Sequence, residues 1–100
     1  MITAGELTKA LALTALVPVE ENQILDIKGC YIGDLLSNVM AKAQPGNLWF
    51  TVMTNPNIVA VAHLLGLAGI VILEGHEPMK DTLEKAKEEG VLLFSSTVSA

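Results

Sequence analysis

The chain has 100 residues, of which 51% are hydrophobic and only 4% aromatic, and its formal net charge is −5. This length suits one folded domain spanning residues 1–100, with a core built from aliphatic side chains. The basic side chains are six lysines without any arginine, so the chain lacks the positive surface that nucleic-acid binding requires.

The first half of the chain predicts two helices with extended segments between them. Thr3 and Glu6 have the spacing of a capping box, which predicts a helix from there to about residue 14. Residues 24–32 are typical of a strand that would break at Gly29. Asp34 is then placed to cap a second helix, which the turn residues Pro45-Gly46-Asn47 would end.

Cys30 lies in this predicted strand and is the single cysteine of the chain. One cysteine excludes an intramolecular disulfide and a cysteine zinc cluster, and it fits a reducing compartment. Residues 58–73 are strongly apolar but short for a membrane span, and they contain His63. We therefore expect a cytoplasmic domain without membrane association.

The second half predicts two consecutive strand–helix–strand units. Pro56 suits the first turn of one helix, with Thr54 or Asn55 as its cap, and Gly90 suits the end of a helix that opens at Glu77-Pro78. Strands joined by helices run parallel, so we expect an α/β fold in which helices flank a mainly parallel sheet. The predicted strands are residues 48–53, 69–73 and 91–94.

The helix after Pro56 is apolar on almost every side between Ile58 and Leu65. A helix of this kind must be covered on more than one face, and a small domain offers little cover of its own. We therefore expect a homodimer that uses either the helix at residues 56–66 or a face of the sheet.

A small polar cluster follows each strand of the second half. Parallel strands place their carboxyl ends along one edge of a sheet, where open α/β sheets bind ligands. Helix N-termini, hydroxyls and amides at that edge suit a polar or anionic small molecule, although helix capping would also explain them. The candidate ligand-binding residues are Thr54, Asn55, Asn57, Glu74, Gly75, His76, Ser95 and Ser96.

The sequence contains no recognisable catalytic apparatus. His76 lies beside Glu74 and Glu77, which would suit either an acid–base group or an ordinary loop histidine. His63 and His76 lack the spacing of a zinc motif, and there is no glycine-rich phosphate loop. We expect no catalytic residue, no metal and no cofactor.

Five segments carry a resemblance to a known family through their order and spacing: residues 31–40, 46–51, 54–62, 68–78 and 90–96. They resemble the DRTGG domain family, which is similar to the amino-terminal domain of HPr serine kinase/phosphorylase. The resemblance covers nearly the whole chain and is clearest over residues 30–97. It implies a single compact α/β domain without catalysis of its own.

The resemblance also implies a mode of action, because the family occurs as a regulatory insert in some phosphotransacetylases and CBS-domain pyrophosphatases. There it helps to form dimers that adenine nucleotides regulate. Here Pro56-Asn57 replaces the charged pair that names the family, and Glu74 adds a carboxylate that would repel phosphate. Three functions remain open: a ligand-sensing homodimer, an accessory module that only binds proteins, and a small enzyme using His76.

Overall fold

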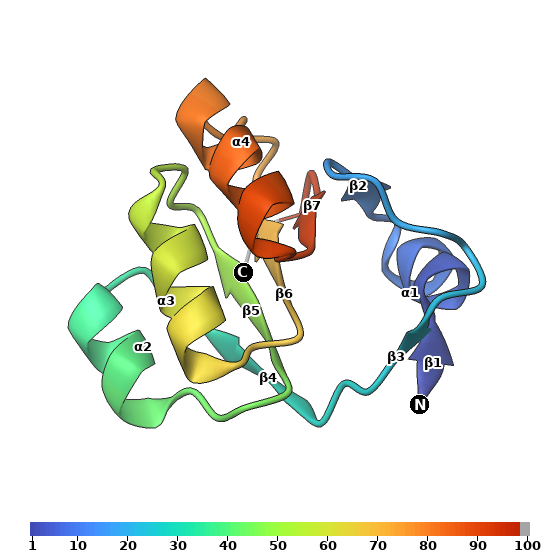
Figure 1. The fold of residues 1–100 in the computed structure, drawn as a ribbon, viewed down its shortest axis with the longest axis horizontal. Helices are drawn as coiled ribbons and strands as arrows, with labels where there is room; N and C mark the ends of the chain where they lie inside the picture. The colour runs from blue at the N-terminus through green and yellow to red at the C-terminus, as the bar shows by residue number, and fades with distance from the viewer. Residues whose placement is uncertain (99–100) are drawn as a thin grey trace.

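The computed structural model describes residues 1–98, which form four helices and seven short strands (Figure 1). The helices are α1 (Ala4–Leu11), α2 (Leu36–Lys42), α3 (Asn57–Leu65) and α4 (Lys80–Glu89). The strands are β1 (Ile2–Thr3), β2 (Thr14–Ala15), β3 (Ile24–Leu25), β4 (Gly29–Ile32), β5 (Asn47–Thr51), β6 (Gly69–Ile72) and β7 (Leu93–Ser95).

Five of these strands form one sheet in the order β2-β7-β6-β5-β4. The pairs β4–β5, β5–β6 and β6–β7 are parallel, and only β2 runs antiparallel to its neighbour β7. Every residue of the central strand β6 is buried, as its continuous apolar run predicts. The predicted α/β fold with a mainly parallel sheet is therefore confirmed.

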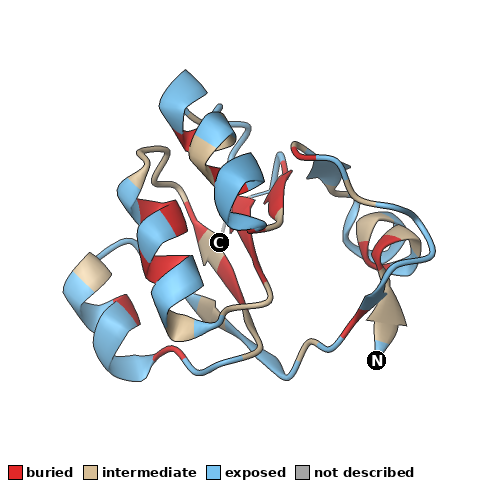
Figure 2. Ribbon diagram, in the orientation of Figure 1, coloured by how far each residue is buried: buried red, intermediate tan, exposed pale blue. Residues whose placement is uncertain are grey.

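Helices and the N-terminal segment cover opposite faces of this sheet. On one face, α2, α3 and α4 pack over side chains that include Trp49, Ile70 and Leu93 (Figure 1). On the other face, Leu7 of α1 and Leu25 of β3 join Phe94 in a second apolar cluster. Buried residues accordingly concentrate on the strands and on the inner sides of the helices (Figure 2).

The N-terminal capping box is confirmed. The Thr3 hydroxyl accepts from the Glu6 N–H at 3.1 Å, and the Glu6 carboxylate accepts from the Thr3 N–H at 3.0 Å. This backbone hydrogen bond, together with the Thr3 hydroxyl, lowers the pKa of Glu6 below its ordinary value. The helix ends at Leu11 rather than near residue 14, because Ala12 adopts a left-handed conformation with φ of 53°.

The segment before β5 differs from its prediction at two points. The predicted strand over residues 24–32 is interrupted as expected, but the break lies at residues 26–28 and not at Gly29: β3 pairs with β1 in a separate two-stranded sheet, and β4 begins at Gly29. Asp34 does not cap α2, whose N-cap position is Leu35 without a side-chain hydrogen bond. The Asp34 carboxylate accepts from the Thr51 hydroxyl and from the Val52 N–H instead, each at 2.8 Å.

The last helix begins at Lys80, two residues after the predicted opening at Glu77-Pro78. Met79, just before the helix, is 50% exposed, and the buried side chain near the start of α4 is Thr82. The Thr82 hydroxyl donates to the Thr54 carbonyl at 2.6 Å and so ties α4 to the end of the neighbouring strand. Gly90 ends the helix as predicted, with φ of 69°.

The apolar helix α3 is covered within the chain itself. It packs against β6 and lies between α2 and α4 (Figure 1), and His63 is 3.5 Å from the Glu89 carboxylate of α4. Four of its residues are buried: Ile58, Val59, Val61 and Ala62. The composition of this helix alone therefore no longer requires a second copy of the chain.

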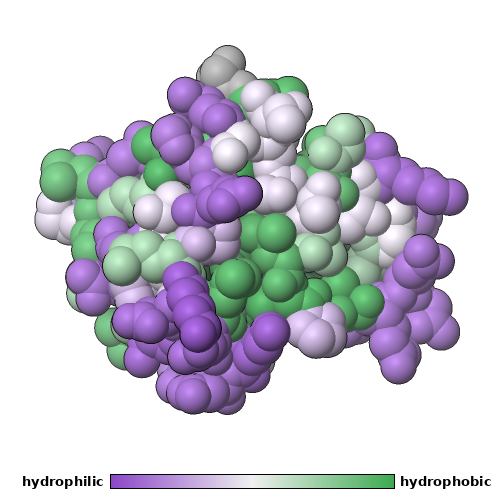
Figure 3. All heavy atoms as spheres, turned by 90° about the horizontal axis from the view of Figure 1, so that it is seen from above, coloured by the Kyte–Doolittle hydropathy of each residue, from purple (hydrophilic) through white to green (hydrophobic). Residues whose placement is uncertain are grey.

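Part of the described surface remains hydrophobic. Seen from above, hydrophobic side chains gather in the middle of the face, and hydrophilic ones dominate on both sides (Figure 3). Exposed apolar residues are common on protein surfaces, so exposure alone does not identify an interaction site. The position of each residue relative to the sheet has to be considered as well. The large exposed apolar side chains within the folded elements and their connections include Leu11, Ile24, Ile32, Leu35, Met40, Leu64 and Met79.

Candidate functional site

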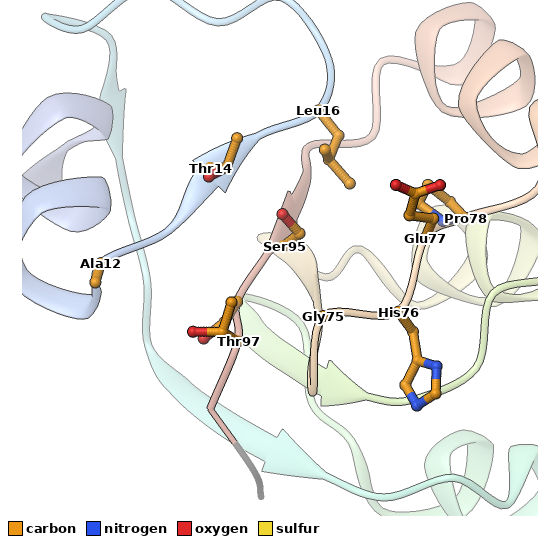
Figure 4. Close-up of a pocket in the computed structure, with 10 residues that line it drawn as sticks. Ala12, Thr14, Leu16, Gly75, His76, Glu77, Pro78, Ser95 and Thr97 are labelled. Carbon is orange, nitrogen blue, oxygen red and sulfur yellow. The ribbon is translucent and has the colours of Figure 1, made fainter.

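A pocket of about 250 Å³ lies at the carboxyl ends of β6 and β7, where the sequence predicts a ligand site (Figure 4). Three segments meet there: the chain around β2, the loop after β6 and the residues that end β7. The lining residues are Ala12, Thr14, Leu16, Gly75, His76, Glu77, Pro78, Ser95, Ser96 and Thr97.

The antiparallel strand β2 supplies one wall of this pocket. Thr14 lies opposite Ser95 in the pairing with β7, and the Leu16 N–H donates to the Leu93 carbonyl at 2.8 Å. In Figure 4 the side chains of Thr14 and Leu16 lie on either side of Ser95. The N-terminal segment therefore pairs with the sheet at β7 and forms one side of the pocket there.

The loop after β6 is a tight turn with two left-handed residues. Glu74 has φ of 59°, Gly75 has φ of 69°, and the His76 N–H donates to the Leu73 carbonyl at 3.2 Å. Two consecutive positive φ values are typical of a type I′ turn. The Gly75 N–H also donates to the Ser96 carbonyl at 2.8 Å, which holds the turn against the end of β7.

The turn conformation predicts that Glu74→Gly stabilises the fold by about 0.5–1 kcal/mol. A left-handed conformation strains any residue with a Cβ, and glycine relieves that strain at a smaller cost in chain entropy. Urea unfolding of the variant against the parent chain measures the difference. Glu77→Gly, where φ is not positive, is the matched control and should lower stability. Equal effects at both positions would contradict the strain argument.

The polar groups of the pocket are mainly hydroxyls. Thr14, Ser95 and Thr97 make no side-chain hydrogen bond within residues 1–98, whereas the buried Ser96 Oγ accepts from the Val98 N–H at 3.2 Å. Glu77 is the one carboxylate among the lining residues, and neither lysine nor arginine lines the pocket. The His76 ring points away from Ser95 and Thr97 in the view of Figure 4.

The predicted site residues fall into two groups. Gly75, His76, Ser95 and Ser96 line the pocket, and Glu74 belongs to the turn beside it. The other three lie at the start of α3, outside the pocket lining: Thr54, Asn55 and Asn57.

Local hydrogen bonds occupy this second group. The Asn55 side chain accepts from the Asn57 N–H at 3.0 Å, and the Thr54 carbonyl accepts from the Met79 N–H at 3.1 Å. These bonds order the beginnings of α3 and α4. The strand ends therefore divide into a pocket at β6 and β7 and a set of helix-start contacts after β5.

Several lining residues escaped the sequence analysis. Thr14 and Leu16 reach the pocket through β2, a strand of only two residues that leaves no alternating pattern to detect. Thr97 directly follows Ser96 and Glu77 directly follows His76, so both could have been included because they adjoin predicted site residues. Ala12 borders the pocket because its left-handed conformation redirects the chain after α1.

Within residues 1–98, no group of three or more His, Cys, Asp or Glu side chains is arranged to hold a metal ion. Over the same residues, no helix has the length and apolar character needed to cross a membrane.

Comparison with known proteins gives a likeness to a solved structure. No model of a protein family matches the sequence, and no curated protein matches it either. The fold is similar to the CBS and DRTGG domains of the regulatory region of Clostridium perfringens pyrophosphatase, which was crystallised with its activator diadenosine tetraphosphate. The TM-score is 0.78 at 16% identity, and the match covers 98% of this chain and 42% of that chain.

This likeness confirms the fold that the DRTGG resemblance implied. The chain spans less than half the length of the pyrophosphatase region, 42%, so it corresponds to a part of that region.

Proposed function

We propose that this chain is a non-catalytic regulatory domain that binds a small polar molecule in the pocket between β2, β6 and β7 and acts as a cytoplasmic homodimer. The observation that carries the proposal is the pocket itself, which lies at the carboxyl ends of the parallel strands β6 and β7 and is lined by hydroxyls. The fold it shares with a regulatory region of a pyrophosphatase supports a regulatory role over a catalytic one.

An adenine nucleotide is the ligand to test first, because the similar region was crystallised with diadenosine tetraphosphate. The chemistry of the pocket favours the nucleoside part of such a molecule. Thr14, Ser95 and Thr97 offer hydroxyls to a ribose or a base, whereas Glu77 would repel a phosphate that no basic lining residue neutralises. The volume of about 250 Å³ is small for a ligand pocket, which also favours one nucleoside group.

The arrangement of the side chains supports a domain without catalysis. His76 points away from the hydroxyls of Ser95 and Thr97 in Figure 4, so it is not placed to activate either of them as a nucleophile. The proposal therefore assigns His76 no chemical step.

Thermal unfolding with adenosine, ATP, diadenosine tetraphosphate and inorganic triphosphate tests the proposal. A ligand present at 100 times its Kd should stabilise the domain by about 2.7 kcal/mol, and each kcal/mol raises Tm by about 4–8 °C in a domain of this size. We expect shifts with the three adenosine compounds and none with triphosphate. Thr14→Val and Ser95→Ala should abolish the shifts, and Ser37→Ala on α2, which does not line the pocket, should retain them.

A shift with triphosphate alone would contradict the assignment of the nucleoside to this pocket. No shift with any of the four compounds, together with capture of a protein partner, would replace the sensing function with that of an accessory interaction module.

A further inference from the structure

Strand β4 ends the five-stranded sheet and leaves its outer side unpaired within the described residues 1–98. Three of its four residues, Gly29, Cys30 and Ile32, are exposed, and Tyr31 is partly buried. The strand contains no charge and no proline, the features by which natural proteins usually protect an exposed edge. A strand of this composition is suited to pairing with another strand.

The directions of the backbone N–H and carbonyl groups show which residues of β4 can pair with a new strand. The Gly33 N–H donates to the Phe50 carbonyl at 3.1 Å, so it faces β5. Because these directions alternate along a strand, Tyr31 also bonds toward β5, while Cys30 and Ile32 direct their N–H and carbonyl groups away from the sheet. These two residues can therefore form a hydrogen-bonded pair with a new antiparallel strand.

Apolar side chains adjoin this edge. Ile32 is 55% exposed, and Leu35 and Met40 on or next to α2 are 59% and 50% exposed. Strand β4 is the outermost strand of the sheet at this edge, and α2 is the outermost helix of the helical layer on the same side (Figure 1). In a two-fold pairing of β4 strands, the α2 helices of both copies would lie on the same side of the joined sheet.

Charges of opposite sign lie just beyond the two ends of the strand. Lys28 precedes it and is 67% exposed, with only a 3.9 Å contact to the exposed Asp26. Asp34 follows it, and its hydrogen bonds to Thr51 and Val52 both use Oδ1, which leaves Oδ2 without a hydrogen bond within residues 1–98. Lys28 and Asp34 are symmetric about Tyr31 in the sequence.

We propose that β4 pairs antiparallel with β4 of a second copy of this chain, in the register that places Cys30 opposite Ile32 of the partner subunit. Tyr31 then lies on the two-fold axis, and Lys28 of each copy lies beside Asp34 of the partner subunit. Sliding the register by two residues in either direction loses both charge pairs, so the charges select one register. The pairing would join two five-stranded sheets into one continuous sheet.

This inference rests on the homodimer of the proposed function and assigns its surface. Sedimentation of the full chain over a range of concentrations should show a dimer. Lys28→Glu should weaken it on the order of tenfold, because two attractive pairs become repulsive. Ile32→Lys should abolish the dimer at the same concentrations. Lys87→Glu, the same charge change on α4, is the control and should leave the dimer intact.

A disulfide tests the register directly. In an Ile32→Cys variant, oxidation should link Cys30 to the new cysteine of the partner subunit, and peptide mapping by mass spectrometry identifies that link. Leu64→Cys, on the exposed side of α3, should form no covalent dimer with Cys30 at comparable yield.

The outcomes separate the inference from the proposed function. A chain that stays monomeric at high concentration overturns both the edge pairing and the homodimer. A dimer that resists Lys28→Glu and Ile32→Lys overturns the edge pairing alone. Circular dichroism of each variant establishes that it is folded, and ligand binding at the pocket is measured independently of either result.

Discussion

Replacing Trp49 by alanine is expected to lower the free energy of unfolding by about 3–5 kcal/mol, the largest effect of any substitution considered for this chain. Trp49 is the single tryptophan, lies on β5 and is fully buried in the cluster beneath the helices. Its indole N–H donates to the Gly33 carbonyl at 2.9 Å, which fixes the chain just after β4. Because domains are stable by only about 5–15 kcal/mol, this loss is a large share of the total.

Urea unfolding followed by circular dichroism measures this loss, since the variant has no tryptophan fluorescence. Trp49→Phe keeps most of the buried ring and loses the hydrogen bond to Gly33, so its loss should be smaller. Leu64→Ala is the control: Leu64 is 69% exposed on α3, and its truncation should change stability by about 0.5 kcal/mol or less. A loss for Trp49→Ala no larger than that of the control would show that Trp49 does not anchor the core.

The parallel part of the fold was predictable because its signals are local. Residues 48–53, 69–73 and 91–94 are apolar runs bounded by turn residues, and β5, β6 and β7 lie within or next to these ranges. The end of α4 at Gly90 was predicted correctly because it depends only on the left-handed conformation of this one residue. The position of the candidate site at the strand ends was predicted from the parallel topology alone.

The N-terminal part was not predictable in this way, because its pairings are distant in the sequence. Ile2 pairs with Leu25, and Thr14 pairs with Ser95 at the opposite end of the chain. A strand of two residues carries no period that a sequence pattern can show. The sequence therefore did not indicate the wall of the pocket that β2 supplies, whereas Gly75, Ser95 and Ser96, which line the same pocket, were among the predicted candidates.

The wrong prediction that Asp34 caps α2 has a different cause. Its position before α2 suits a helix cap, and short polar residues generally favour that role. The tertiary structure uses its carboxylate for another strand, since Thr51 is 1% exposed and its hydroxyl needs an acceptor at that depth. The local sequence shows that a short polar residue precedes the helix, but it does not show which donor the side chain of that residue binds.

Asp34→Ala is accordingly expected to lower the free energy of unfolding by about 2–3 kcal/mol, more than the loss of a single exposed cap. The substitution removes a charged acceptor from two donors at once, the Thr51 hydroxyl and the Val52 N–H. Asp34→Asn keeps an oxygen in place without the charge, and its loss should be about 1 kcal/mol. Urea unfolding monitored by Trp49 fluorescence measures both, at protein concentrations low enough to exclude self-association.

Asp26→Ala is the matched control for this experiment. Asp26 is also a carboxylate near β4, but its side chain is 64% exposed and contacts only Lys28, at 3.9 Å. An exposed pair of this kind contributes about 0–1 kcal/mol, so the variant should stay close to the parent chain. If Asp34→Ala and Asp26→Ala lose equal stability, the two hydrogen bonds of Asp34 do not hold the ends of β4 and β5 together. If only Asp34→Ala is destabilised, the carboxylate joins the edge strand to the centre of the sheet, and the rigid edge that self-pairing requires depends on it.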